Sequence, residues 1–167
     1  NISRFNLKII DSHCHLDYEK FENDLDQVIN RAKGSGVSKI LTICTKKNNL
    51  NKNINICEKN DFIFFAYGLH PLNIGKEKID TKEILRISDH KKMIAIGETG
   101  LDYFYSKETI HLQKKSFIEH INISQKTKLP LIIHSRDADE DMQTILNEEY
   151  KKILLLQLCI VFHLVKH

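Results

Sequence analysis

The sequence predicts an α/β protein in which helices cover a parallel sheet. Short apolar runs alternate along the chain with segments whose apolar residues recur at helical spacing. Several runs are apolar at successive positions, which is typical of strands buried on both faces. These patterns leave two architectures open, an open doubly wound sheet and a (β/α)₈ barrel. No glycine-rich phosphate-loop motif is present, which weakens the nucleotide-binding form of the open sheet.

Composition indicates one globular domain, and we expect residues 1–167 to form it. Apolar residues make up 41% and charged residues 28%, and the net charge of +3 is too small to establish nucleic-acid binding. Four cysteines without a Cys-x-x-Cys motif predict free thiols in a reducing compartment, so we expect a cytoplasmic protein. The longest apolar run, residues 153–165, is interrupted by Gln157 and His163, so we expect no membrane partner.

The first half of the chain reads as strand, helix, strand and helix. Residues 7–11 predict a short buried strand that ends on His13 and His15. One apolar stripe at helical spacing then predicts a helix, with Phe21, Leu25, Val28, Ile29 and Ala32 as its members. Residues 39–44, rich in β-branched side chains, predict the second strand, and residues 50–59 predict the helix after it.

The second half continues the same alternation. The elements predicted there are strand 62–68, helix 82–87, strand 93–98 with an exit loop at 99–104, helix 107–126, strand 131–134, helix 138–150 and strand 153–162. The chain therefore alternates strand and helix throughout, as parallel sheets require.

Chemically reactive side chains gather where the predicted strands end. Because the carboxyl ends of parallel strands meet at one edge, six metal-competent side chains are expected there. They are His13, His15, His70, Glu98, His134 and His163. Cys14 is expected to pack away from this edge, since neighbouring side chains of a strand point to opposite faces.

These residue types predict a site for two divalent metal ions, with Zn, Mg and Mn as candidates. His13, His15, Glu98, His134 and His163 are the predicted ligands, and Glu98 is the predicted bridge between the metals. Two metals can activate water and stabilise both oxygens of a phosphoryl displacement, so no serine or cysteine nucleophile is needed.

Three further positions have two readings each. His70 lies just before a proline, and we expect it either to bind substrate or to bond its own loop. Arg136 offers a planar fork for phosphate oxygens, with a surface or helix-capping ion pair to Asp137 as the alternative. Gly97 leaves room for close backbone approach, although a strand-end turn would equally explain Gly97 and Gly100.

Four stretches resemble the TatD family of metal-dependent deoxyribonucleases, a branch of the amidohydrolase-like TIM barrels. They are residues 11–17, 68–71, 96–103 and 129–138. The resemblance implies a TIM-barrel type (β/α) repeat and a metal-dependent hydrolase of DNA phosphodiester bonds, often an exonuclease. It also implies that His13 and His15 hold one metal, that Glu98 bridges, that His134 holds the second, and that DNA is the partner.

The resemblance also sets out what this sequence lacks. The residues after His163 do not match the family, and two further strands and an aspartate ligand of the family are absent. We therefore expect an incomplete barrel with about six strands of eight. Two alternatives stay open: a related barrel hydrolase of an ester or amide, and an inactive remnant that still binds metal.

Overall fold

A six-stranded parallel sheet, in the order β1-β2-β3-β4-β5-β6, forms the centre of the computed structural model. The model describes residues 8–152 and 160–164. The strands are β1 (Ile9–Cys14), β2 (Val37–Cys44), β3 (Ile63–Tyr67), β4 (Met93–Asp102), β5 (Leu131–Arg136) and β6 (Ile160–Leu164). Strand order follows chain order, so the sheet is part of a (β/α) barrel and not a doubly wound sheet.

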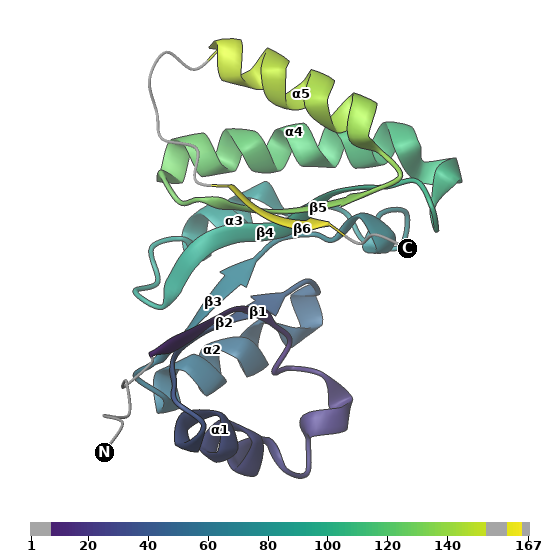
Figure 1. Cartoon of the computed structure of the whole chain (residues 1–167). Helices are drawn as coiled ribbons and strands as arrows, with labels where there is room; N and C mark the ends of the chain where they lie inside the picture. Colours follow the sequence, from purple (N-terminus) through teal and green to yellow (C-terminus); the bar gives the residue numbers. More distant parts are fainter. Residues whose placement is uncertain (1–7, 153–159, 165–167) are drawn as a thin grey trace, which may run out of the picture.

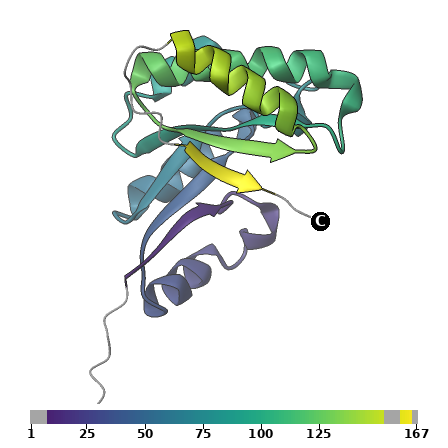
Figure 2. The same cartoon turned by 45° about the horizontal axis from the view of Figure 1, so that its top comes forward.

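Helices connect successive strands and lie on the outer side of the curved sheet (Figures 1 and 2). They are α1 (Leu25–Gly34), α2 (Leu50–Lys59), α3 (Thr81–Ile87), α4 (Ile110–Thr127) and α5 (Asp139–Lys152). The predicted helices are therefore confirmed to within a few residues at each end. No helix in the described ranges is both long and apolar enough to cross a membrane.

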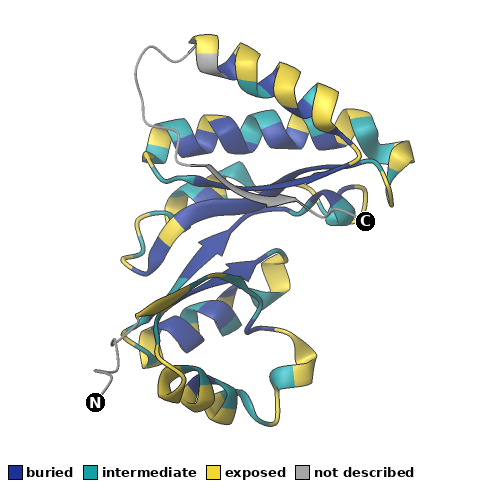
Figure 3. Cartoon of the chain, in the orientation of Figure 1, coloured by how far each residue is buried: buried dark blue, intermediate teal, exposed yellow. Residues whose placement is uncertain are grey.

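The core has an outer and an inner part because the central strands are apolar on both faces. Phe65, Ile96 and Phe117 belong to the large cluster that packs the sheet against its helices. Ile43 and Ile132 belong to a smaller cluster on the other face of the sheet. Figure 3 shows that β3, β4 and β5 are mostly buried, whereas the helices carry exposed residues on their outward sides. This arrangement confirms the fold class that the apolar runs predicted.

Two predicted strand boundaries were wrong. The predicted exit loop at residues 99–104 is largely strand, because β4 continues to Asp102 and pairs with β5 as far as Arg136. Gly97 and Gly100 thus lie inside a strand and not in a turn. The first strand runs further than expected and includes His13, while most of the predicted strand 153–162 lies outside the described residues.

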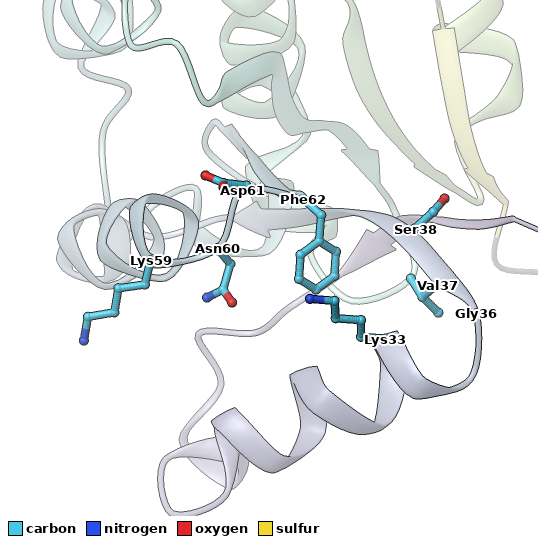
Figure 4. A pocket seen from close by; sticks show the side chains of 8 residues that line it. All are labelled: Lys33, Gly36, Val37, Ser38, Lys59, Asn60, Asp61 and Phe62. Atoms are coloured by element: carbon cyan, nitrogen blue, oxygen red, sulfur yellow. The ribbon is translucent and has the colours of Figure 1, made fainter.

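A cavity of about 540 Å³ lies at the amino-terminal edge of the sheet, opposite the strand ends that carry the predicted site (Figure 4). Its lining residues end α1 and α2, precede β2 and β3, or begin β2: Lys33, Gly36, Val37, Ser38, Lys59, Asn60, Asp61 and Phe62. None of them is a predicted site residue. In barrels of this type this edge serves stability, so the carboxyl edge is where chemistry is sought.

A substitution at Gly97 can test how closely β4 and β5 must approach each other. A Cβ at this position would lie 2.5 Å from the carbonyl oxygen of Ile132, and the backbone φ of +127° disfavours any side chain. We expect Gly97→Ala to lower the free energy of unfolding by about 2 kcal/mol or more in urea titrations.

Gly34→Ala is the matched control, since no atom lies within 4 Å of a Cβ there. This change in α1 is expected to be neutral or stabilising by up to about 1 kcal/mol. Equal effects of the two substitutions would contradict the close approach.

Candidate metal centre

Glu98 is the centre of a cluster of histidines at the carboxyl edge of the sheet. Its side chain is buried, and its two oxygens face different partners. Oε2 lies 3.3 Å from His13 Nε2, whereas Oε1 lies 3.2 Å from His134 Nδ1 and 3.8 Å from His70 Nε2. One carboxylate from β4 therefore contacts imidazoles from β1, from β5 and from the segment after β3.

The cluster divides into two groups that share Glu98. The first comprises His13, His15 and Glu98, and the second comprises His70, Glu98 and His134; within each group the donor atoms lie within 4.8 Å of one another. Imidazole nitrogens and a carboxylate are suitable donors for zinc and its first-row neighbours. The residues present thus fit a pair of metal ions bridged by Glu98.

His15 is held with one ring nitrogen directed into the site. Its Nδ1 donates a hydrogen bond to the carbonyl oxygen of Ile43 at 2.9 Å, which leaves the lone pair on Nε2. The ring also stacks on Tyr18, with centroids 4.8 Å apart and an angle of 10° between the planes. Such outer contacts are typical of metal-binding histidines, because they fix the tautomer and the ring orientation.

His134 has a carboxylate on each side of its ring. Nε2 lies 2.9 Å from Asp102 Oδ2, and Nδ1 faces Glu98. Burial alone would lower the pKa of His134, but the hydrogen bonds to Glu98 and Asp102 outweigh it and raise the pKa. Asp102 thereby directs Nδ1 toward Glu98, in the arrangement of a carboxylate-supported metal ligand.

Glu98 stays ionised although it is buried. Burial raises the pKa of the carboxyl, but hydrogen bonds from His13 and His134 outweigh it and hold the pKa well below its usual range. A buried carboxylate of this kind requires positive partners, and either protonated imidazoles or metal ions can supply that charge.

His70 differs from His15 and His134 in which ring nitrogen faces the site, the one that carries the proton. The backbone N–H of Leu72 donates to His70 Nδ1 at 3.2 Å, so the proton of the neutral ring sits on Nε2, the atom that faces Glu98 and His134. Burial lowers the pKa of His70 to about 4, although the charge of Glu98 opposes the shift. This neutral ring is a hydrogen-bond donor into the site, even though its distance would also allow metal binding.

The remaining predicted residues also lie at this edge. Arg136 follows His134 on the same face of β5, and its guanidinium carbon lies 4.2 Å from the ring centroid of Phe104. The backbone of His163 in β6 pairs with that of His134 in β5; the side chain of His163 lies outside what the structure describes. Cys14 faces the other way, toward the core and the carbonyl oxygen of Leu41.

Comparison with known proteins identifies a family model and several similar chains. A family model described as TatD related DNase matches residues 10–167. YabD of Bacillus subtilis, named an uncharacterized metal-dependent hydrolase, is 39% identical over 142 residues, which are 84% of this chain and 56% of YabD. YcfH of Escherichia coli, with the same description, is 38% identical over 144 residues, 84% of this chain and 54% of YcfH.

A solved structure is similar in fold as well. The crystal structure of YjjV, a TatD homolog from Escherichia coli, superimposes with a TM-score of 0.78 at 28% identity, covering 84% of this chain and 56% of that one. The chain thus spans about half the length of the relatives that it matches.

Two buried polar residues of α4 support the site, and neither was predicted from the sequence. His120 accepts a hydrogen bond from the backbone of Leu69, next to His70, at 3.0 Å and donates to the carbonyl oxygen of Ser116. Gln113 bonds both backbone polar groups of Asp102. Both lie on the apolar stripe of the helix, and that was the available signal, because a polar residue in a buried position needs specific partners.

His120 makes the stability of the chain depend on pH. Its complete burial lowers the pKa to about 4, so between pH 6.5 and 4 the unfolded chain binds a proton that the folded chain does not. This contribution to stability is full above pH 6.5 and is lost as the pH falls through that window. Between pH 7 and 5 we expect a loss of about 2 kcal/mol from this group.

The test compares urea unfolding of the parent chain and of His120→Gln at pH 7, 6 and 5. All other titrating groups are common to both proteins, so the difference between the two curves isolates His120. The expected result is a flatter pH dependence for His120→Gln. Parallel curves would show that His120 is not held neutral.

Proposed function

We propose that this chain, which belongs to the TatD family of metal-dependent hydrolases, hydrolyses phosphodiester bonds of DNA with two divalent metal ions. The observation that carries the proposal is the sharing of Glu98, whose two oxygens face separate groups of histidines. The description of the family model as TatD related DNase supports DNA as the substrate. An exonuclease, which removes nucleotides from a DNA end, is the narrower form of the proposal.

In this proposal His13, His15 and one oxygen of Glu98 hold the first metal. Glu98 and His134 would hold the second, and His163 of β6 is the proposed additional ligand. When bound, the two ions supply an activated water and stabilise the charge on the attacking and leaving oxygens of the phosphodiester.

Neighbouring groups of the protein fix the charge and the orientation of these ligand atoms. Glu98 is ionised, and the carbonyl of Ile43 and the carboxylate of Asp102 fix which nitrogens of His15 and His134 point inward. His13 Nε2 and His134 Nδ1 lie against the oxygens of Glu98, and a ring nitrogen that binds a metal must carry no proton. Metal affinity is therefore expected to weaken as the pH falls.

Two residues are proposed to contact the substrate. His70 presents the Nε2 proton of a neutral ring, which suits a non-bridging phosphate oxygen as acceptor. Arg136 lies one repeat of β5 beyond His134, so its planar fork can hold a neighbouring phosphate of the same strand. Both roles are binding and orientation, whereas Glu98 is the catalytic residue.

Glu98→Gln is the direct test of the activity. After removal of metals with a chelator, a 5′-labelled single-stranded DNA is incubated with the chain and with added Mg²⁺, Mn²⁺ or Zn²⁺. We expect metal-dependent cleavage by the parent chain and a loss of at least about 100-fold in Glu98→Gln, because one carboxylate serves both metals.

Glu148→Gln, an exposed change on α5, is the matched control and is expected to cleave like the parent. Cleavage that persists in the chelator or in Glu98→Gln would refute the proposal. A parallel panel of ester and amide substrates tests the related hydrolase, and metal binding without any hydrolysis would favour a binding-only chain.

Metal binding itself is tested by thermal unfolding. A metal that binds only the folded chain, at about 100 times its dissociation constant, adds about 3 kcal/mol and raises the Tm by about 5–10 °C. We expect this shift to reverse with chelator, to shrink strongly in Glu98→Gln, and to titrate with two ions per chain in calorimetry. A stoichiometry of one would contradict the bridged pair.

A further inference from the structure

Two exposed aromatic side chains follow β4 directly beside the metal centre. Phe104 is 45% exposed and Tyr105 is 59% exposed. We propose that Phe104, Tyr105 and Arg136, here called the aromatic platform, form a stacking site for an unpaired nucleobase next to the bond to be cleaved. The inference rests on the proposed function and narrows its substrate to DNA with single-stranded ends.

The three planar groups of the aromatic platform contact one another. The ring centroids of Phe104 and Tyr105 lie 4.7 Å apart at 88°, an edge-to-face arrangement. The guanidinium carbon of Arg136 lies 4.2 Å from the first centroid and 4.5 Å from the second. The buried arginine thus supports both rings by cation–π contact while the rings themselves reach solvent.

The aromatic platform is tied to the metal centre through Asp102. One oxygen of this carboxylate lies 2.9 Å from His134 Nε2, and the other accepts the backbone N–H of Tyr105 at 2.9 Å. Arg136 lies two residues after His134 on the same face of β5, a distance of about 7 Å along the strand. One nucleotide spans a similar length of single-stranded chain, so a base can reach the rings while its neighbouring phosphate lies at Glu98.

The loop that carries the rings is also held in place. The side-chain amide of Gln113, which is fully buried, bonds the backbone of Asp102 and of Ser106. These bonds fix the loop on both sides of the two aromatic residues. A stacking surface that is fixed before binding loses little entropy when a base is added.

The exposure of the rings favours a ligand over a packing role. Among the described residues, three phenylalanine or tyrosine side chains are exposed: Tyr18, Phe104 and Tyr105. Each of them follows a strand that supplies a predicted metal ligand. Aromatic faces and an adjacent guanidinium are the groups on which unpaired bases stack, without regard to base identity. In a duplex both faces of an internal base are already covered, so only an unpaired base can use them.

The test measures binding rather than cleavage. Fluorescence anisotropy with a labelled single-stranded oligonucleotide is recorded in chelator, so that the readout is independent of hydrolysis. We expect Phe104→Ala and Tyr105→Ala each to weaken binding by roughly 5-fold or more, since one stacked base contributes about 1–3 kcal/mol. Leu112→Ala is the matched control, because Leu112 is 47% exposed on α4, and we expect it to bind like the parent.

An oligonucleotide of the same length with abasic sites separates stacking from phosphate contact. We expect the parent chain to bind it as weakly as Tyr105→Ala does, and Tyr105→Ala to bind both oligonucleotides alike. A 2-aminopurine base near the end should lose fluorescence on binding the parent chain and keep it with Tyr105→Ala.

Equal binding of base-containing and abasic strands by the parent chain would overturn the inference, as would equal affinity for duplex and single strand. Either result leaves the proposed hydrolase intact, since cleavage is measured separately. Conversely, base-dependent binding without any metal-dependent cleavage would retain the stacking site and reject the proposed activity.

Discussion

The buried carboxylate of Glu98 is the constraint on which the rest of the site depends. Removing an ionised group from water is very unfavourable unless positive partners surround it. Here β1, β5 and the segment after β3 each bring an imidazole to one of its two oxygens. These elements meet because parallel strands in chain order place their carboxyl ends at one edge. The parallel order of the strands therefore produces both the curved sheet and the cluster of side chains at its carboxyl edge.

A second layer of hydrogen bonds decides what each imidazole can do. The carbonyl of Ile43 and the carboxylate of Asp102 leave the inward nitrogens of His15 and His134 available as ligands, while the backbone of Leu72 makes His70 a donor. Residues with the same side chain therefore have different roles in one cluster. In addition, hydrogen bonds of Gln113 and His120 connect α4 to the end of β4 and to the loop after β3.

Much of this could be predicted from the sequence, because the signals were local. Apolar runs and helical stripes gave the strands and helices, and reactive residues at strand ends gave His13, His15, Glu98 and His134 as one cluster. The predicted end of β4 was wrong, because residues 99–102 have the local pattern of a loop. They form a strand only because they pair with β5. His120 was missed as a support for a related reason, since Leu69, the residue whose backbone it binds, is 51 residues away in the sequence.

The sequence by itself determined the alternation of strands and helices, the family and the presence of metal-competent residues at the strand ends, because these follow from periodicity and from local motifs. Only the tertiary structure decided how the oxygens of Glu98 are divided between the histidines, which ring nitrogens face inward, and that Phe104 and Tyr105 stay exposed against Arg136. These properties depend on distances and hydrogen bonds between separate strands and helices, and no local pattern of residues specifies them.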